Sequence, residues 1–146
     1  MADKVPSGKP RVIVYGTLKQ GHGNHRLLEG QEFLGRIKLD DKFVMYNLGP
    51  FPAVVHLDEV PEEIADDVTT VFGEVYSVDT ECLAAMDVLE GNGRYYTRKK
   101  VPTKEFKNAW IYLFPKEATK RYPRSAIVEG GLWRPSAEER EWVDAL

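Results

Sequence analysis

The first block of apolar residues along the chain, residues 11–15, is continuous and rich in β-branched side chains. Val12, Ile13 and Val14 stand together in it, with no polar residue between them. A short apolar run of this kind is typical of a strand that is buried on both faces. Because Gly16 follows Tyr15 directly, the pattern predicts a buried strand that ends in a glycine-containing loop.

Apolar runs and alternating patterns predict further strands along the chain. They cover residues 33–39, 43–48, 53–57, 69–77, 95–101 and 109–114. In the last of these, Trp110, Tyr112 and Phe114 share one face, while Ile111 and Leu113 share the other. Since both faces are apolar, we expect this strand in the interior of a sheet.

Helices are predicted from capping residues and from the spacing of apolar positions. The longest opens at residue 79 or 80 and stops at Gly91. Shorter helices are predicted over residues 25–29, where Asn24 is the capping residue, and after Ser136. Many strands with few helices predict an α+β fold, a small mixed β-barrel with a few flanking helices.

A chain of 146 residues is near the usual size of one domain, so residues 11–146 are interpreted as a single domain. Residues 1–10 are polar, carry proline and glycine, and are interpreted as a disordered N-terminal tail. The acidic residues 58–67 fit no calcium loop and are interpreted as a solvated excursion. Residues 115–135 are interpreted as an extended loop.

Charge and composition narrow the range of partners. The formal net charge of −3 argues against nucleic acid, whose binders show a basic face. The single Cys82 cannot form an internal disulfide, and no stretch approaches the ~20 apolar residues of a membrane span. Since the N-terminus has no signal-peptide pattern, we expect a cytoplasmic protein without a membrane partner, and a monomer by default.

The loop Tyr15-Gly16-Thr17-Leu18 is the first candidate for chemistry. Glycine lets successive backbone N–H groups turn toward a ligand, and such groups can cradle a carboxylate. Taken alone, the tetrapeptide is more typical of an ordinary glycine between strand and turn. The glycine spacing is wrong for a phosphate loop or a dinucleotide fingerprint, which argues against nucleotide binding.

The end of the longest helix places Glu90 close to an apolar face in the last turn. The negative helix end and partial burial both disfavour an ionised carboxylate, so they raise its pKa toward the range of a general base. Spacing alone is equally compatible with a surface glutamate. Tyr95 and Tyr96 follow in a predicted strand, where alternation lets only one of them face a pocket.

Other catalytic arrangements lack their parts. The three histidines show no metal-ligand pattern with Cys82, and no serine stands in a nucleophile elbow. The sequence therefore predicts no metal site.

Three segments are considered together: the loop of residues 15–18, the helix end at Glu90, and the segment with Tyr95 and Tyr96. They resemble the γ-glutamylcyclotransferase-like, or AIG2-like, family, and within it the γ-glutamylamine cyclotransferases. The resemblance rests on residues 15–21, Asn24, His25, Arg26 and Leu28, on residues 73–79, and on Leu89-Glu90 with Tyr96 and Arg98. It runs in order from residue 11 to about 114 and is weaker at residues 130–133. One departure is Met86, which stands before Asp87 where the family has leucine.

The resemblance implies a compact α+β fold around a β-barrel, with a pocket where the loop of residues 15–18 faces Glu90. It implies that this loop holds the α-carboxylate and amine of a γ-glutamyl group, and that Glu90 is the catalytic acid/base. Tyr96 and, by a looser match, Tyr112 are implied to line the pocket.

The implied reaction closes a γ-glutamyl group onto its own α-amine, giving 5-oxoproline and a free amine or amino acid. No cofactor is needed, because the substrate carries both nucleophile and electrophile. A non-catalytic module that binds γ-glutamyl compounds or other small molecules is the alternative. The identity of the leaving group is not determined by the sequence, although the match of residues 15–28 favours γ-glutamylamines.

Overall fold

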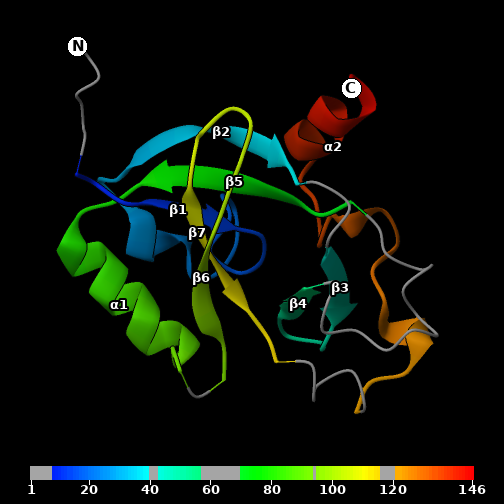
Figure 1. The fold of residues 1–146 in the computed structure, drawn as a ribbon. Coiled ribbons are helices and arrows are strands. Elements are labelled where there is room, and N and C mark those ends of the chain that lie inside the picture. The colour runs from blue at the N-terminus through cyan, green and yellow to red at the C-terminus, as the bar shows by residue number, and fades with distance from the viewer. Residues whose placement is uncertain (1–7, 40–42, 57–69, 94, 116–120) are drawn as a thin grey trace.

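The computed structural model describes residues 8–39, 43–56, 70–93, 95–115 and 121–146 (Figure 1). The interpreted acidic excursion and most of the interpreted N-terminal tail lie outside these residues. Within them, no helix is long and apolar enough to cross a membrane.

The main sheet has five strands in the order β2-β5-β1-β7-β6. Their bounds are β1 (Arg11–Val14), β2 (Glu32–Lys38), β5 (Phe72–Ser77), β6 (Thr97–Val101) and β7 (Ala109–Leu113). The central strand β1 pairs antiparallel with β5 and parallel with β7. Both sequence expectations are confirmed here, since β1 is the buried centre of the sheet and β7 lies inside it rather than at an edge.

A second sheet consists of the hairpin β3 (Phe43–Asn47) and β4 (Pro52–His56). The backbone N–H of Phe114, just after β7, donates to the carbonyl of Val54 at 2.8 Å and so ties the hairpin to the main sheet. The expected α+β class with a small mixed sheet is confirmed. In the described residues the strands form an open sheet with a docked hairpin instead of a closed barrel.

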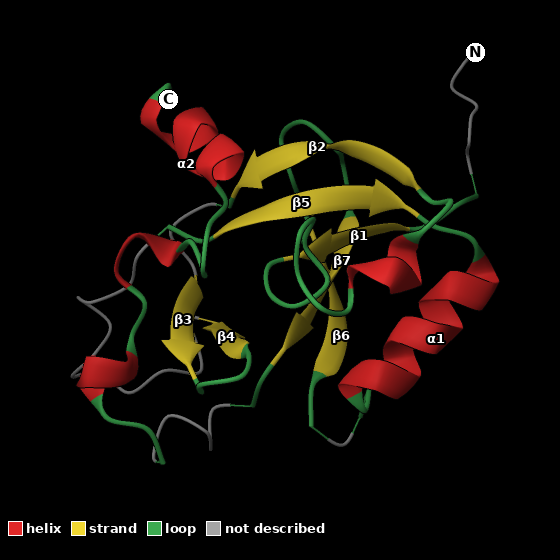
Figure 2. Ribbon diagram, turned by 180° about the vertical axis from the view of Figure 1, so that it is seen from behind, coloured by secondary structure: helices red, strands yellow, loops and turns green. Residues whose placement is uncertain are grey.

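The main sheet separates two apolar clusters, because side chains alternate along its strands. Ile13 of β1 packs in one cluster with Ile111 and Trp133, whereas Val12 packs in the other with Met86. Met86 belongs to α1 (Thr80–Glu90), which Figure 2 shows along one side of the molecule, away from the hairpin. The apolar cluster that contains Val12 and Met86 therefore fixes the position of α1 relative to β1.

The ends of α1 follow the capping rules that its sequence predicts. The Asp79 side chain accepts a hydrogen bond from the N–H of Cys82, and Gly91 ends the helix in the left-handed conformation, with φ of 61°. Ser136 similarly caps α2 (Ala137–Asp144) through the N–H of Glu139. Asn24 is an exception: it precedes the short 3₁₀ helix η2 (His25–Leu28), but its side chain donates to Thr17 and makes no cap.

The segment expected as an extended loop is a packed element over residues 121–135. It contains two short 3₁₀ turns, η6 (Arg124–Ala126) and η7 (Glu129–Gly131). The N–H of Val128 donates to the carbonyl of Met45 at 2.8 Å, and Trp133 is 3% exposed. The arginine, proline and glycine residues of this segment form turns, and these turns fold back onto the core. Local sequence patterns do not reveal this packing, because it depends on residues distant in the chain.

The glycine pair in η7 provides a stability test. Both Gly130 (φ 80°) and Gly131 (φ 65°) are left-handed, but a Cβ at Gly131 would lie 1.5 Å from the carbonyl oxygen of Thr70, whereas one at Gly130 meets nothing within 4 Å. Gly130→Ala should cost about 1–2 kcal/mol, the cost of a left-handed alanine. Gly131→Ala should cost at least about 4 kcal/mol. Urea unfolding of both variants checks this, and equal losses would contradict the packing described for η7.

Candidate active site

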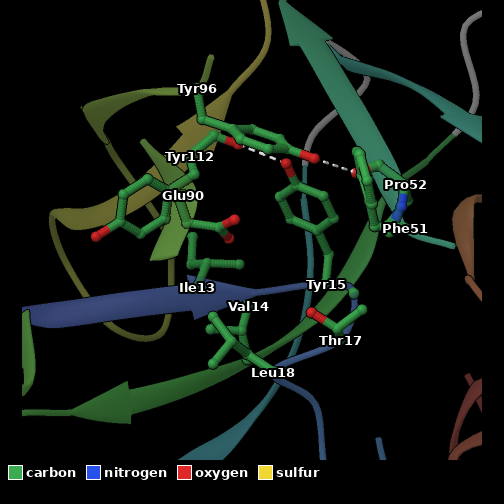
Figure 3. A pocket seen from close by; sticks show the side chains of 11 residues that line it. Ile13, Val14, Tyr15, Thr17, Leu18, Phe51, Pro52, Glu90, Tyr96 and Tyr112 are labelled. Carbon is green, nitrogen blue, oxygen red and sulfur yellow. Dashed lines mark hydrogen bonds between the residues drawn. The ribbon is translucent and has the colours of Figure 1, made fainter. Parts of the chain in front are cut away.

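A pocket opens where β1 ends, and we call it the inner pocket (Figure 3). It is lined by Ile13, Val14, Tyr15, Gly16, Thr17, Leu18, Phe51, Pro52, Glu90, Tyr96 and Tyr112. All the site residues expected from the sequence are in this set: the loop of residues 15–18, Glu90, Tyr96 and Tyr112. They come from four separate parts of the chain, which the sheet and α1 bring together.

The loop after β1 is shaped by a close approach at Gly16. A Cβ on this residue would lie 2.7 Å from Cδ of Pro52, so the space between the loop and β4 admits only glycine. Among the described residues, the backbone N–H groups of Gly16, Thr17 and Leu18 have no hydrogen-bond acceptor. Consecutive free N–H groups at a pocket wall are suited to binding an anionic oxygen.

Two pocket tyrosines use their hydroxyl protons to hold the fold together. The Tyr15 hydroxyl donates to the carbonyl of Tyr112 at 2.5 Å, and the Tyr96 hydroxyl donates to the carbonyl of Pro52 at 2.8 Å (Figure 3). Burial raises the pKa of Tyr15 well above its ordinary value, so this phenol stays neutral. Because both hydroxyl protons are already donated, each hydroxyl oxygen can still accept a hydrogen bond from an N–H group of a ligand.

Glu90 is the last residue of α1, and its carboxylate lies in the pocket wall (Figure 3). Burial raises its pKa from 4.5 to about 7, as the sequence predicted in direction. No described residue donates a hydrogen bond or an ion pair to this carboxylate. Glu90 can therefore gain or lose a proton near neutral pH, which is the requirement for a general acid/base.

Asp87, one turn earlier on α1, has the opposite environment. Its carboxylate accepts hydrogen bonds from Arg98 Nε at 2.8 Å, Arg98 Nη2 at 3.0 Å and the Tyr112 hydroxyl at 2.6 Å. Burial alone would raise the pKa of Asp87, but these donors outweigh it and lower the pKa. One helix thus carries an ionised carboxylate that holds Tyr112 in place and a protonatable one that faces the pocket.

Lys19 anchors the far end of the loop, a role that the sequence did not reveal. It is fully buried, and its Nζ donates to the carbonyl of Trp133 at 2.7 Å and to both carboxylate oxygens of Glu139, at 2.9 and 3.0 Å. Since Glu139 belongs to α2, this ion pair fastens the loop to the C-terminal helix.

The structure also corrects the expectation for Tyr95. Strand β6 begins at Thr97 rather than at residue 95, so strand alternation does not govern the two tyrosines. Tyr96 lines the inner pocket, and Tyr95 and Tyr96 both line an adjoining groove, so the expectation that only one of them faces a pocket is wrong. The sequence analysis also assigned no role to Phe51 and Pro52, whose only local signal is an aromatic residue between two prolines.

The described residues contain no group of three or more His, Cys, Asp or Glu side chains arranged to hold a metal ion. The pocket geometry instead combines a protonatable carboxylate, free backbone N–H groups and tyrosine oxygens.

Comparison with known proteins places the chain in a family. Residues 12–135 match the sequence profile described as "Gamma-glutamyl cyclotransferase, AIG2-like". The chain belongs to this family. The resemblance noted in the sequence is therefore confirmed at family level, and the profile match continues beyond residue 114, to residue 135.

The relatives of this family member include two proteins whose names contain the term gamma-glutamylcyclotransferase. A Vibrio cholerae protein is 34% identical over 122 residues, covering 84% of this chain and 93% of its own. A Methanocaldococcus jannaschii protein is 37% identical over 129 residues, covering 84% and 94%. Among solved structures, Escherichia coli ytfP is 30% identical and superposes with a TM-score of 0.58, covering 85% of this chain and 96% of its own.

The buried ion pair behind the loop predicts a large loss of stability when it is broken. Lys19→Met leaves the Glu139 carboxylate buried without its partner, which should cost about 3–5 kcal/mol in the free energy of unfolding. Glu138→Gln is the control, because the Arg36–Glu138 pair is exposed on the glutamate side and should cost less than about 1 kcal/mol. Denaturant unfolding measures both, and a Lys19→Met loss as small as the control's would contradict the anchoring role.

The raised pKa of Glu90 predicts a pH-dependent cost to the fold. Between pH 4.5 and about 7 the unfolded chain ionises Glu90 while the folded chain keeps it protonated, so this residue lowers stability as pH rises through that window. Glu90→Gln removes the cost and should stabilise the protein by about 3 kcal/mol more at pH 8 than at pH 4. Unfolding of both proteins at the two pH values tests this. Glu81→Gln, exposed at the start of α1, should show no such difference.

Proposed function

We propose that the protein is a γ-glutamylcyclotransferase that converts a γ-glutamyl amide into 5-oxoproline and a free amine. The observation that carries the proposal is the pairing, in one pocket, of Glu90 with the free N–H groups of the loop. Membership of the γ-glutamylcyclotransferase family supports the same reaction.

Each half of the γ-glutamyl group has a suitable partner in the inner pocket. The N–H groups of Gly16, Thr17 and Leu18 would bind the α-carboxylate or the oxyanion that forms at the γ-carbon. The hydroxyl oxygens of Tyr15 and Tyr96 would accept hydrogen bonds from the α-amine. The substrate would thus be held bent, with its nucleophile against its electrophile.

The chemical step needs one proton carrier and no other reagent. The neutral α-amine attacks the γ-carbonyl carbon, and Glu90 takes the proton that this nitrogen must lose. The tetrahedral intermediate then collapses, the bond to the leaving nitrogen breaks, and Glu90 returns the proton to that nitrogen. One C–N bond forms and one breaks, so no water is consumed. A carboxyl with a pKa of about 7 is suited to both transfers.

Entry of the γ-glutamyl group requires side chains to move. The inner pocket has a cavity volume of about 20 Å³, roughly the space of one water molecule. Phe51, 39% exposed at the rim, is the side chain best placed to swing outward.

We propose that the leaving group is an amine, as in γ-glutamylamines. The support for this class is the resemblance of residues 15–28 to the γ-glutamylamine cyclotransferases.

The reaction predicts a specific loss when Glu90 is replaced. Glu90→Gln keeps the side-chain shape but removes the proton carrier, so 5-oxoproline formation should fall by about 10²–10⁴ in kcat. In the wild type, kcat/KM should rise with pH through a midpoint near 7, because the deprotonated carboxylate is the base, and it should level off only above the pKa of the substrate α-amine, which must be neutral to attack. Chromatographic measurement of 5-oxoproline and released amine tests both, with Glu81→Gln as the control on the same helix.

Two results would contradict the assignment. Wild-type turnover by Glu90→Gln would remove Glu90 from the reaction. Saturable binding of γ-glutamyl compounds without any release of amine would show instead a non-catalytic binding module on this fold.

A further inference from the structure

The free N–H groups of the loop after β1 are oriented by hydrogen bonds to the carbonyls beside them. In a trans peptide unit, the C=O group and the N–H group of the next residue lie in one plane and point in opposite directions. The carbonyl of Gly16 accepts from the N–H of Lys19 at 3.0 Å, and this bond fixes the direction of the Thr17 N–H. The carbonyl of Thr17 accepts from the N–H of Asn24 at 2.9 Å, which likewise fixes the Leu18 N–H.

His25 holds the third carbonyl of the loop. Its ring Nδ1 lies 2.9 Å from the carbonyl oxygen of Leu18. Since a carbonyl oxygen can only accept, Nδ1 must carry the proton of this hydrogen bond. The peptide unit held in this way contains the Lys19 N–H, which in turn holds the Gly16 carbonyl and so orients the N–H of Thr17. A side chain beyond the loop thus controls a donor in the pocket wall through two peptide units.

His25 can act as a support because it is itself held by the core. It opens η2, whose Leu28 is 2% exposed and packs in the apolar cluster with Val12 and Met86. The ring of His25 also lies 5.9 Å from the ring of Tyr76, measured between centroids. His25 is not among the described residues that line the inner pocket or the adjoining groove. Its effect on a ligand would therefore pass through the backbone of the loop.

We infer that His25 is a positioning residue, whose Nδ1–H orients the Leu18–Lys19 peptide and, through it, the Thr17 N–H that would bind an anionic oxygen of the substrate or the intermediate. This inference rests on the proposed cyclotransferase reaction and adds to it a residue outside the pocket lining. Asn24 orients the Leu18 N–H by its own main chain, which a side-chain substitution leaves in place. His25 acts by its side chain, so substitution can test its role.

The tautomer of His25 provides a test on the wild-type protein. Long-range ¹H–¹⁵N NMR of the neutral ring should show a proton on Nδ1 and none on Nε2. A proton on Nε2 with a bare Nδ1 would overturn the inference, because Nδ1 could not then donate to the carbonyl of Leu18. This measurement needs neither a variant nor a substrate, so its result does not depend on whether the protein is an enzyme.

A matched pair of variants tests the effect on the reaction, with γ-glutamyl-propylamine as the substrate. In His25→Asn the amide nitrogen can occupy the place of Nδ1, whereas His25→Leu fills the space without a donor. At pH 8, kcat/KM per folded molecule should fall at least about tenfold in His25→Leu, because a donor to the anionic oxygen is misplaced. His25→Asn should stay within about threefold of the wild type, since the donor is restored. A role in stability alone would leave both variants at the wild-type rate and would overturn the inference.

Arg26→Leu is the control on the same short helix. Arg26 is exposed and donates from Nη1 to the carbonyl of Gly23 at 3.2 Å, which is not one of the three carbonyls that orient the pocket donors. Its kcat/KM should change less than about twofold, and a loss as large as that of His25→Leu would contradict the specific role of His25. If His25→Leu does not fold, His25→Gln replaces it, because the glutamine amide nitrogen corresponds to Nε2 and not to Nδ1. Wild-type turnover by His25→Gln would equally overturn the inference.

The two proposals fail in different ways. If the wild type and both His25 variants release amine at equal rates, the cyclotransferase reaction stands and the positioning role falls. If the wild type does not convert the substrate, the proposed reaction falls, and calorimetry with 5-oxoproline, which carries an α-carboxylate, decides the positioning role. Binding at least about tenfold tighter by the wild type and His25→Asn than by His25→Leu would then support it. Equal binding, or no binding by the wild type, would overturn it.

Discussion

The site depends on the position of β1 as the central strand of a mixed sheet. Hydrogen bonds from β5 on one side and β7 on the other leave β1 no freedom of register, so the loop after Val14 begins at a determined place. The parallel pairing with β7 brings Tyr112 beneath that loop, where its carbonyl accepts the Tyr15 hydroxyl. Val12 of the same strand belongs to one apolar cluster with Cys82 and Met86 of α1, and this cluster places the end of that helix opposite the loop.

Burial by this packing has different consequences for the two carboxylates of α1. Asp87 receives three donor groups and remains an ionised support for Tyr112, whereas Glu90 receives none from the described residues and is pushed toward neutrality. By linkage, the raised pKa should make the fold less stable at pH 8, where Glu90 is ionised. A functional carboxyl that costs stability is typical of active sites, because the raised pKa and the instability have the same cause.

The apolar surroundings of Glu90 explain its proton affinity. Tyrosine, phenylalanine and aliphatic side chains line the inner pocket together with this carboxyl. Burial among them raises the pKa of Glu90 to about 7, because it disfavours the ionised form. A cation introduced beside Glu90 would stabilise the ionised form and lower this pKa.

The sequence by itself determined the elements whose causes are local: the buried β1 run, the apolar faces of β7, the Asp79 cap and the Gly91 stop of α1. It also indicated Glu90 and the loop of residues 15–18, because these short segments carry the resemblance to the family. Only the tertiary structure decided what depends on contacts distant in the chain. The Lys19–Glu139 ion pair joins residues 120 positions apart, and Gly16 is required by Pro52 rather than by a turn. Tyr95 lines the groove that adjoins the inner pocket, since β6 starts two residues later than its pattern predicts, and no local periodicity shows where a strand meets its neighbour.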